Sequence, residues 1–262
     1  MVKTAGAVGG LLLGLLMGGE IAAGEVAPAS AGATPVASAP QGPFMTVGRV
    51  EKDDGRDTLR YPNELMAFLA IKPGSTVVDL GAGDGYTSMY LAREVGPEGA
   101  VYAQNPPAWS DYLVPALKDR LKGGPLVGIT WIDQPFEAAI PPEIQGVDLV
   151  TNVLTYHDTL YMTVDREKMN ANVYGALRPG GRYVIVDHAA READAGDVGG
   201  TLHRVSEAFL IAEVERAGFA LSSRSEIMRD ASDDHTGVAW AEPQPRTDRF
   251  VLSFVKPVAE GG

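Results

Sequence analysis

The chain of 262 residues contains no cysteine. It therefore cannot form disulfides, use a thiolate nucleophile, build a zinc–thiolate site or carry a lipoprotein-type lipidated cysteine. This absence suits an oxidising compartment. Basic residues are also few, with 22 Lys and Arg against 34 Asp and Glu, a formal net charge of −12 and a pI near 4.8. We expect no nucleic-acid partner, because polyanion binding needs a basic face.

The first apolar run, residues 5–17, is shorter than the ~20 residues that span a bilayer comfortably. It follows the positive charge of Lys3 and precedes small residues at 22–24, a pattern typical of a secretory signal. We expect residues 1–24 to be a signal peptide or membrane anchor, which would place the protein in the periplasm or otherwise outside the cytoplasm. An uncleaved segment would tether the chain to a membrane. Alternatively, translation begins at Met45 and the protein stays in the cytoplasm.

Residues 25–47 are rich in Ala, Pro, Gly and Ser and have few large apolar groups, which predicts a flexible linker. The length and the 45% hydrophobic content then allow one good-sized core. We expect one domain over residues 48–257, followed by a disordered tail at 258–262.

Apolar strand-like segments alternate with amphipathic helical patterns from Tyr61 onward. This alternation predicts an α/β fold with a mostly parallel sheet covered on both faces and an antiparallel strand near the C-terminus. The seven predicted strands are residues 76–80, 100–103, 127–132, 147–152, 183–187, 219–227 and 249–255. One predicted helix begins at Pro62, and four further helices are predicted over residues 86–95, 110–121, 165–177 and 202–217.

A glycine-rich turn joins the first predicted strand to the next helix, where residues 79–85 read Asp-Leu-Gly-Ala-Gly-Asp-Gly. Glycines allow a sharp turn and a close backbone approach to a ligand, and the helix start offers free N–H groups. A dinucleotide fingerprint would need its third glycine where Tyr86 stands, so the spacing disfavours nicotinamide and flavin cofactors. The alternative is a tight turn without a ligand.

Further motifs accompany this turn, namely Ile-Lys-Pro-Gly at 71–74, Tyr-His-Asp at 156–158, Leu-Arg-Pro-Gly-Gly-Arg at 177–182, Val-Asp-His at 186–188, Leu-His-Arg at 202–204 and Thr-Asp-Arg-Phe at 247–250. Together with Asp79, two positions before the first glycine, they resemble class I S-adenosylmethionine-dependent methyltransferases. More narrowly, they resemble bacterial predicted methyltransferases that carry signal peptides. The resemblance covers residues 48–257 and implies a Rossmann-like seven-stranded fold, S-adenosylmethionine as cofactor and transfer of its methyl group to a small-molecule acceptor.

The same resemblance implies a set of cofactor-binding residues. In the family the acid helps to hold the methionine amino group, the glycines leave space, and the ends of the second and third strands contact ribose and adenine. The residues implied here are Asp79, Gly81, Ala82, Gly83, Gly85, Tyr86, Gln104, Asn105, Asp133, Gln134 and Asn152. The second strand ends in Gln104 and Asn105, where the family usually has Asp or Glu. An amide oxygen accepts without charge assistance, which predicts weaker binding or a different ligand.

Five residues form a cluster of candidate catalytic groups: His157, Asp158, Asp187, His188 and His203. They lie just beyond predicted strands or at a helix start, at the sheet edge where open parallel sheets bind ligands. His157 or His188 could be a general base that takes a proton from the acceptor. Alternatively, the cluster converges on a divalent metal that acidifies the acceptor. We assign no metal ligands, because no helical i, i+4 ligand pair occurs, and purely structural roles also stay open.

Two other functions are compatible with these residues. The fold could support a different, metal-assisted chemistry at the His/Asp cluster, or it could be a non-catalytic module for a small anionic or nucleoside ligand. Fold alone does not choose between them. The cluster favours an enzyme, because ligand binding alone would not need it.

Overall fold

The computed structural model describes residues 48–122, 124, 126–241 and 244–258. The predicted signal segment 1–24, the predicted linker 25–47 and most of the predicted tail lie outside the described residues. Within the described part, no helix has the length and apolar character needed to cross a membrane.

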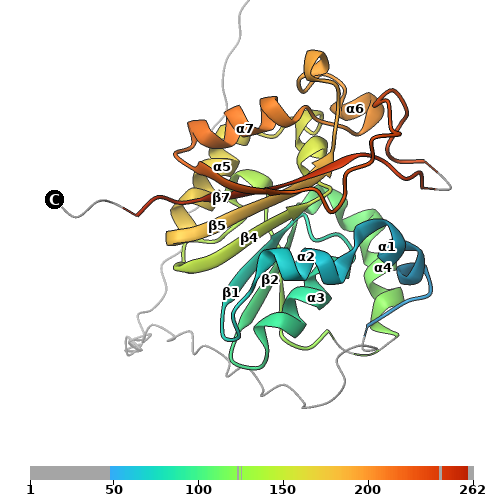
Figure 1. Cartoon of the computed structure of the whole chain (residues 1–262). Coiled ribbons are helices and arrows are strands. Elements are labelled where there is room, and N and C mark those ends of the chain that lie inside the picture. Colours follow the sequence, from blue (N-terminus) through green and yellow to red (C-terminus); the bar gives the residue numbers. More distant parts are fainter. Residues whose placement is uncertain (1–47, 123, 125, 242–243, 259–262) are drawn as a thin grey trace, which may run out of the picture. The chain divides into compact units, whose positions relative to one another are not determined.

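A seven-stranded sheet forms the centre of the fold, with the strand order β3-β2-β1-β4-β5-β7-β6 (Figure 1). Neighbouring strands from β3 to β5 are parallel, whereas β7 is antiparallel to both β5 and β6. The order reverses between β1 and β4, and an open sheet binds ligands beyond the carboxyl ends of its strands at such a point. The strands are β1 (Thr76–Leu80), β2 (Ala100–Asn105), β3 (Ile129–Asp133), β4 (Val147–Val153), β5 (Leu177–His188), β6 (Ala220–Ser225) and β7 (Arg249–Val255). The predicted fold class is confirmed.

Helices cover both faces of the sheet (Figure 1). Neighbouring residues of a strand point to opposite faces, so the sheet has a hydrophobic core on each side. Val77 packs with α2 and α3 in one core, and Val78 packs with α4, α5 and α7 in the other. The helices are α1 (Lys52–Arg60), α2 (Pro62–Leu69), α3 (Tyr86–Val95), α4 (Ser110–Leu121), α5 (Arg166–Ala176), α6 (Gly199–Leu202) and α7 (Glu207–Arg216). Short 3-10 turns are η1 (Pro107–Trp109), η2 (Phe136–Ala138), η3 (Tyr156–Leu160) and η4 (Glu192–Asp194).

The predicted continuous helix over residues 202–217 is wrong. Helix α6 ends at Leu202, because His203 adopts a left-handed conformation with φ of 54°. A new helix then starts after Ser206, whose hydroxyl accepts a hydrogen bond from the backbone N–H of Phe209 at 3.2 Å. Serine is a strong N-cap residue, so α7 has its own start signal in the middle of the predicted helix.

The Leu-Arg-Pro-Gly-Gly-Arg motif at residues 177–182 forms an irregular start of β5, ahead of the predicted strand 183–187. Leu177 pairs with Val147, and Arg182 pairs with Leu149, so the intervening residues bulge out of the ladder. Gly180 lies there with φ of 75°, and its N–H donates to the carbonyl of Lys256 at 2.8 Å. The bulge lets β5 start directly after α5.

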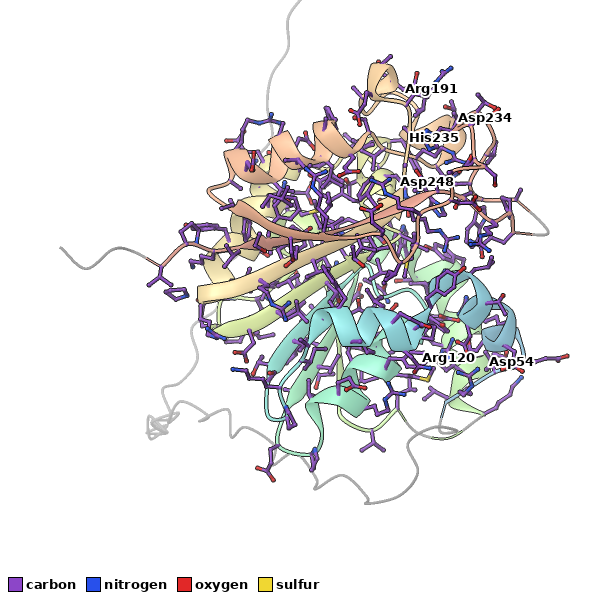
Figure 2. All side chains as sticks on the ribbon, viewed as in Figure 1. Asp54, Arg120, Arg191, Asp234, His235 and Asp248 are labelled. Carbon is purple, nitrogen blue, oxygen red and sulfur yellow. The ribbon has the colours of Figure 1, made fainter. Side chains whose placement is uncertain are left out.

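Helix α1, which was not predicted, is held to the glycine turn by buried ion pairs. Arg120 of α4, labelled in Figure 2, has no exposed side-chain surface and contacts both Asp53 and Asp84 at 2.9–3.0 Å. Asp84 also pairs with Lys52 and Arg56 at 2.9 Å. Burial alone would raise the pKa of Asp84, but Arg56 and Arg120 hold it far below its ordinary value. This network fixes the first half of α1 against the glycine turn.

Candidate active site

Each glycine of the turn has a separate reason to be glycine. Gly81, Gly83 and Gly85 all have positive φ, of 66°, 60° and 83°. A Cβ on Gly81 would lie 2.3 Å from Thr155, and one on Gly85 would lie 3.0 Å from Trp131. A Cβ on Gly83 would meet no atom within 4 Å. Gly83 is therefore the position where a ligand can approach the backbone, whereas the other two allow close packing.

Asp79 lies at the carboxyl end of β1 and is almost completely buried. Its carboxylate accepts hydrogen bonds from the hydroxyls of Ser88 at 2.6 Å and Thr151 at 2.9 Å. Burial raises its pKa to about 6, although both hydrogen bonds act in the opposite direction. The carboxylate borders the cavity over the turn, so it is placed to meet a cation there.

This first cavity, of about 280 Å³, contains five of the predicted cofactor residues in its wall: Asp79, Gly81, Ala82, Gly83 and Tyr86. Arg60, at the end of α1, also lines it. Among the described residues no carboxylate pairs with Arg60, and its Nε is buried without a hydrogen-bond partner. Its guanidinium lies 5.2 Å from the ring centroid of Tyr86. Burial and the cation of Arg56 lower the pKa of Arg60 to about 10, so it stays charged and open to an anion.

The amides at the end of β2 bind the turn itself. Gln104 accepts from the N–H of Gly81 at 3.1 Å and donates to the carbonyl of Gln134 at 2.6 Å. Asn105 accepts from the N–H of Gly83 at 2.8 Å and donates to its carbonyl at 2.9 Å. A carboxylate could accept these bonds but not donate them, which explains why amides stand here. The first cavity is not lined by the remaining predicted cofactor residues, Gly85, Gln104, Asn105, Asp133, Gln134 and Asn152.

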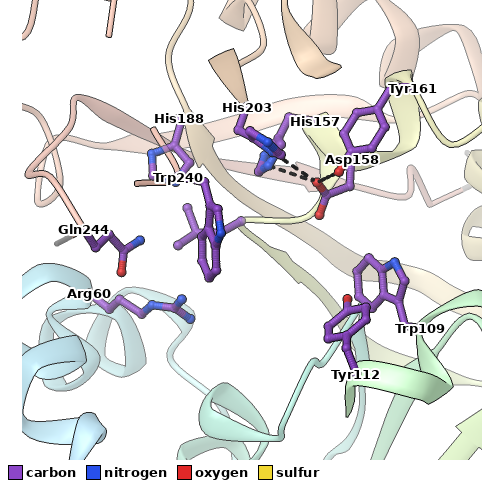
Figure 3. A pocket seen from close by; sticks show the side chains of 11 residues that line it. Arg60, Trp109, Tyr112, His157, Asp158, Tyr161, His188, His203, Trp240 and Gln244 are labelled. Carbon is purple, nitrogen blue, oxygen red and sulfur yellow. Dashed lines mark hydrogen bonds and ion pairs between the residues drawn. The ribbon is translucent and has the colours of Figure 1, made fainter. Parts of the chain in front are cut away.

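A second cavity, of about 390 Å³, adjoins the first and contains four of the candidate catalytic residues in its wall: His157, Asp158, His188 and His203 (Figure 3). The two cavities share lining residues, including Arg60, Trp109 and Asp158. Asp187 does not line the cavity but holds His157 in place. One of its oxygens lies 2.6 Å from His157 Nδ1, and the other accepts from the His157 backbone N–H at 2.8 Å. The structure thus brings all five candidate residues together.

His157 lies between two carboxylates. Its Nδ1 contacts Asp187, and its Nε2 lies 3.2 Å from Oδ1 of Asp158. Burial alone would lower the pKa of His157, but Asp187 and Asp158 raise it to about 10. With both N–H groups donated to carboxylates, the ring has no lone pair left to accept a proton. This geometry disfavours His157 as the general base.

His188 is a neutral hydrogen-bond donor to the cavity. Its Nδ1 lies 2.6 Å from the hydroxyl of Thr247 and 3.3 Å from Nε of Arg249. An arginine can only donate, so Nδ1 accepts and Nε2 carries the proton. Burial, and then the cation of Arg249, lower the pKa of His188 well below its ordinary value. Nε2–H therefore serves as a donor rather than as a base.

Asp158 combines exposure to the cavity with one oxygen, Oδ2, that accepts no hydrogen bond from the part of the chain that the structure describes. Its Oδ1 accepts from the hydroxyl of Tyr161 at 2.7 Å and lies near His157 and His203. Its Oδ2 points away from these partners (Figure 3). Burial would raise the pKa of Asp158, but the hydrogen bond from His157 lowers it. Asp158 is therefore an ionised acceptor at the junction of the two cavities.

Sequence reasoning missed several residues of this site. Arg60 belongs to a helix without an apolar stripe, and no motif marks it. Tyr112 and Tyr161 also line the second cavity. Tyr112 lies on the predicted helix 110–121 and Tyr161 follows η3, but no sequence motif marks either side chain as part of a site. Thr247, which contacts His188, belongs to the Thr-Asp-Arg-Phe motif at 247–250. That motif was the one signal in the sequence that could have assigned it to the site.

Residues 78–185 match the family model described as a methyltransferase domain. The arsenite methyltransferase of Halobacterium salinarum is 26% identical over 134 residues, which are 51% of this chain and 32% of that protein. The ubiquinone/menaquinone biosynthesis C-methyltransferase of Marinomonas sp. is 25% identical over 124 residues, 47% of each chain. The chain thus matches a third to a half of the length of these curated relatives.

Solved structures share the fold. A SAM-dependent methyltransferase from Aquifex aeolicus superposes with a TM-score of 0.59 at 20% identity, covering 78% of this chain and 94% of that one. The [4+2]-cyclase SpnF superposes with a TM-score of 0.58 at 16% identity, covering 81% of this chain and 85% of that one. The match to a methyltransferase domain supports S-adenosylmethionine as the cofactor. The strand order and the acid-glycine turn agree with the methyltransferase domain that residues 78–185 match.

Proposed function

We propose that the protein transfers the methyl group of S-adenosylmethionine to a small-molecule acceptor. The proposal is carried by the opposite charges of Asp79 and Arg60 in the wall of one cavity. The methionine part of the cofactor is a zwitterion, so its ammonium would meet Asp79 and its carboxylate would meet Arg60. The open space over Gly83 lets the ligand approach the turn. The residues present therefore fit the methionine half of the cofactor.

The adenosine half would bind differently from the usual pattern. The amides of Gln104 and Asn105 are engaged by the turn, so they offer no charged acceptor to the ribose. Trp109 and Tyr112 line both cavities, and their rings suit contact with a purine. We infer that stacking replaces part of the ribose recognition, with a weaker affinity than a carboxylate would provide.

The second cavity would hold the acceptor beside the methyl group. When bound, the cofactor supplies a sulfonium methyl that is open to direct displacement. In that displacement an oxygen or nitrogen of the acceptor would bond to the methyl carbon, and the electron pair of the carbon–sulfur bond would pass to sulfur. Nε2–H of His188 orients the acceptor by donating a hydrogen bond, and Oδ2 of Asp158 accepts the acceptor's proton.

Substituting Arg60→Met should weaken the binding of S-adenosylhomocysteine about tenfold or more, because a hydrogen-bonded charge pair is lost. Isothermal titration of the full-length protein measures this affinity. The affinity for 5′-methylthioadenosine, which lacks the amino-acid group, should not change. Folding stability should hold, since Arg60 has no ion pair to lose among the described residues.

Arg191→Met, which alters an exposed ion pair with Asp194, is the matched control and should bind like the wild type. If the wild-type protein binds neither S-adenosylhomocysteine nor S-adenosylmethionine, the proposed function is wrong. Equal loss of affinity for both ligands in Arg60→Met would show that Arg60 does not contact the carboxylate.

We also propose that the protein works outside the cytoplasm. The support is the pattern of Lys3 and the apolar residues 5–17, which lie outside the described residues. Cell fractionation with an antibody should detect the protein in an exported or membrane fraction. A full-length product confined to the cytosol would contradict this proposal.

A further inference from the structure

We propose that His157, Asp158 and His203 bind one divalent first-row transition-metal ion, such as Zn²⁺, Mn²⁺, Fe²⁺ or Co²⁺. The ion would lie in the wall of the second cavity. Its binding is independent of the proposed methyl transfer, and only its catalytic role rests on that function.

The separations of the three residues are close to the edges of a coordination shell. Each contributes one ligand atom, and these atoms all lie within 4.8 Å of one another. Asp158 Oδ1 lies 3.2 Å from His157 Nε2 and 3.6 Å from His203 Nδ1. Metal–ligand bonds of about 2.1 Å place neighbouring ligands about 3.0–3.4 Å apart in octahedral or tetrahedral geometry. Small side-chain rotations are enough to close the shell.

Hydrogen bonding alone does not account for the convergence of these groups. At 3.6 Å, His203 Nδ1 is too far from Asp158 for a good hydrogen bond. The ring nitrogens of His203 make no hydrogen bond to another residue of the described part, although the ring points at Asp158 (Figure 3). A metal ion bound between His203 and Asp158 would give each side chain a bonding partner.

The surroundings orient the ligands as they do in metal sites. Asp187 accepts from Nδ1 of His157 at 2.6 Å, which directs Nε2 into the cavity. A carboxylate on the far nitrogen is the usual partner of a metal-bound histidine. Tyr161 similarly holds the carboxylate of Asp158 by a hydrogen bond of 2.7 Å. The ion takes the place of the Nε2 proton that otherwise bridges His157 and Asp158.

The backbone at His203 supports the same conclusion. His203 ends α6 in a left-handed conformation, φ 54°, which is unfavourable for a residue with a Cβ. That conformation swings the imidazole toward η3, where His157 and Asp158 lie. Local strain of this kind is found where a side chain must be aimed at a functional site.

The donor set selects the class of ion. Two imidazoles and one carboxylate suit Zn²⁺, Mn²⁺, Fe²⁺ and Co²⁺ rather than Mg²⁺ or Ca²⁺, which prefer oxygen ligands. Three protein ligands leave coordination positions open, as in catalytic rather than structural sites. All three ligand residues line the second cavity, so an acceptor hydroxyl bound to the ion would be acidified, and Oδ2 of Asp158 would take its proton.

The test measures metal binding by full-length protein that carries no polyhistidine tag and has been stripped with a chelator. Titration with Zn²⁺ or Mn²⁺ and elemental analysis should give one ion per chain, and Co²⁺ should give a ligand-field absorption band. His203→Asn should weaken binding at least tenfold and abolish the band, because asparagine tolerates the left-handed backbone but removes the imidazole. Asp187→Asn should weaken binding about 10–100-fold.

His235→Asn is the matched control. His235 also has positive φ, of 62°, and also contacts a carboxylate, Asp248 at 3.0 Å, but it lies outside both cavities. It should bind metal like the wild type. The proposal is overturned if the wild type binds no ion, or if His203→Asn binds as tightly as His235→Asn while remaining folded by circular dichroism. Should Asp187→Asn not fold, His203→Asn alone decides.

Titration with S-adenosylhomocysteine in parallel separates this proposal from the proposed function. Cofactor binding without metal binding would overturn the metal site alone. Metal binding without cofactor binding would overturn the methyltransferase function and leave the metal site standing.

Discussion

The variant Asp79→Asn should lose S-adenosylhomocysteine affinity by about 30-fold or more, as expected when one partner of a buried charge pair is neutralised. The asparagine side chain has nearly the same shape and can still bond Ser88 and Thr151. The lost affinity would therefore report the missing charge rather than a collapsed site. Titration calorimetry near neutral pH measures it.

The raised pKa of Asp79 makes this binding sensitive to acid. Because burial raises its pKa to about 6, the carboxyl group becomes neutral below that pH and no longer attracts an ammonium. Wild-type affinity should fall about tenfold per pH unit below this value. The affinity of Asp79→Asn should stay nearly constant over the same range. A pH-independent affinity in the wild type would mean that Asp79 does not bind the amino group.

Asp79→Asn should also stabilise the fold at neutral pH. The folded-state pKa of about 6 exceeds the ordinary aspartate pKa of 3.8, so the folded protein holds its proton more tightly and stability falls as pH rises between these values. At neutral pH the ionised Asp79 costs up to about 3 kcal/mol. Urea unfolding should show a higher free energy of unfolding for Asp79→Asn than for the wild type at neutral pH, by part of this amount, and little difference near pH 4. A destabilised variant at neutral pH would contradict the argument.

The variant Arg120→Met should lower the free energy of unfolding by about 3–5 kcal/mol, because it removes the fully buried cation that two buried carboxylates share. Arg120 is fully buried and contacts Asp53 and Asp84 at 2.9–3.0 Å. Its loss should also loosen α1 from the glycine turn and thereby move Arg60. Urea unfolding measures the first effect, and cofactor titration measures the second.

Lys122→Met is the control for Arg120→Met. Lys122 lies two residues further along, and its ion pair with Asp119 at 2.9 Å is exposed. Exposed pairs contribute about 0–1 kcal/mol, so this variant should unfold like the wild type. If Arg120→Met lost no more than Lys122→Met, the buried network would not be what holds α1 in place.

Local patterns were sufficient to predict the sheet and most helices. Residues 76–80, 110–121 and 249–255 form the expected elements because side-chain periods of 2 and 3.6 are local properties of the chain. Helix α1 escaped prediction because it is stabilised by ion pairs to distant residues, Asp84 and Arg120, rather than by an apolar stripe. The break at His203 was missed because the cap at Ser206 lies inside a favourable helical pattern.

The candidate site divides in the same way. The sequence by itself determined the glycine turn with Asp79 and the placement of histidines and acids at the carboxyl ends of strands, since these follow from local order along the chain. Only the tertiary structure decided which groups meet: Gln104 and Asn105 bind the turn, Arg60 enters the cavity, and His203 approaches Asp158. These contacts join residues from separate elements, and side-chain hydrogen bonds, burial and charge depend on three-dimensional neighbours that no spacing along the chain specifies.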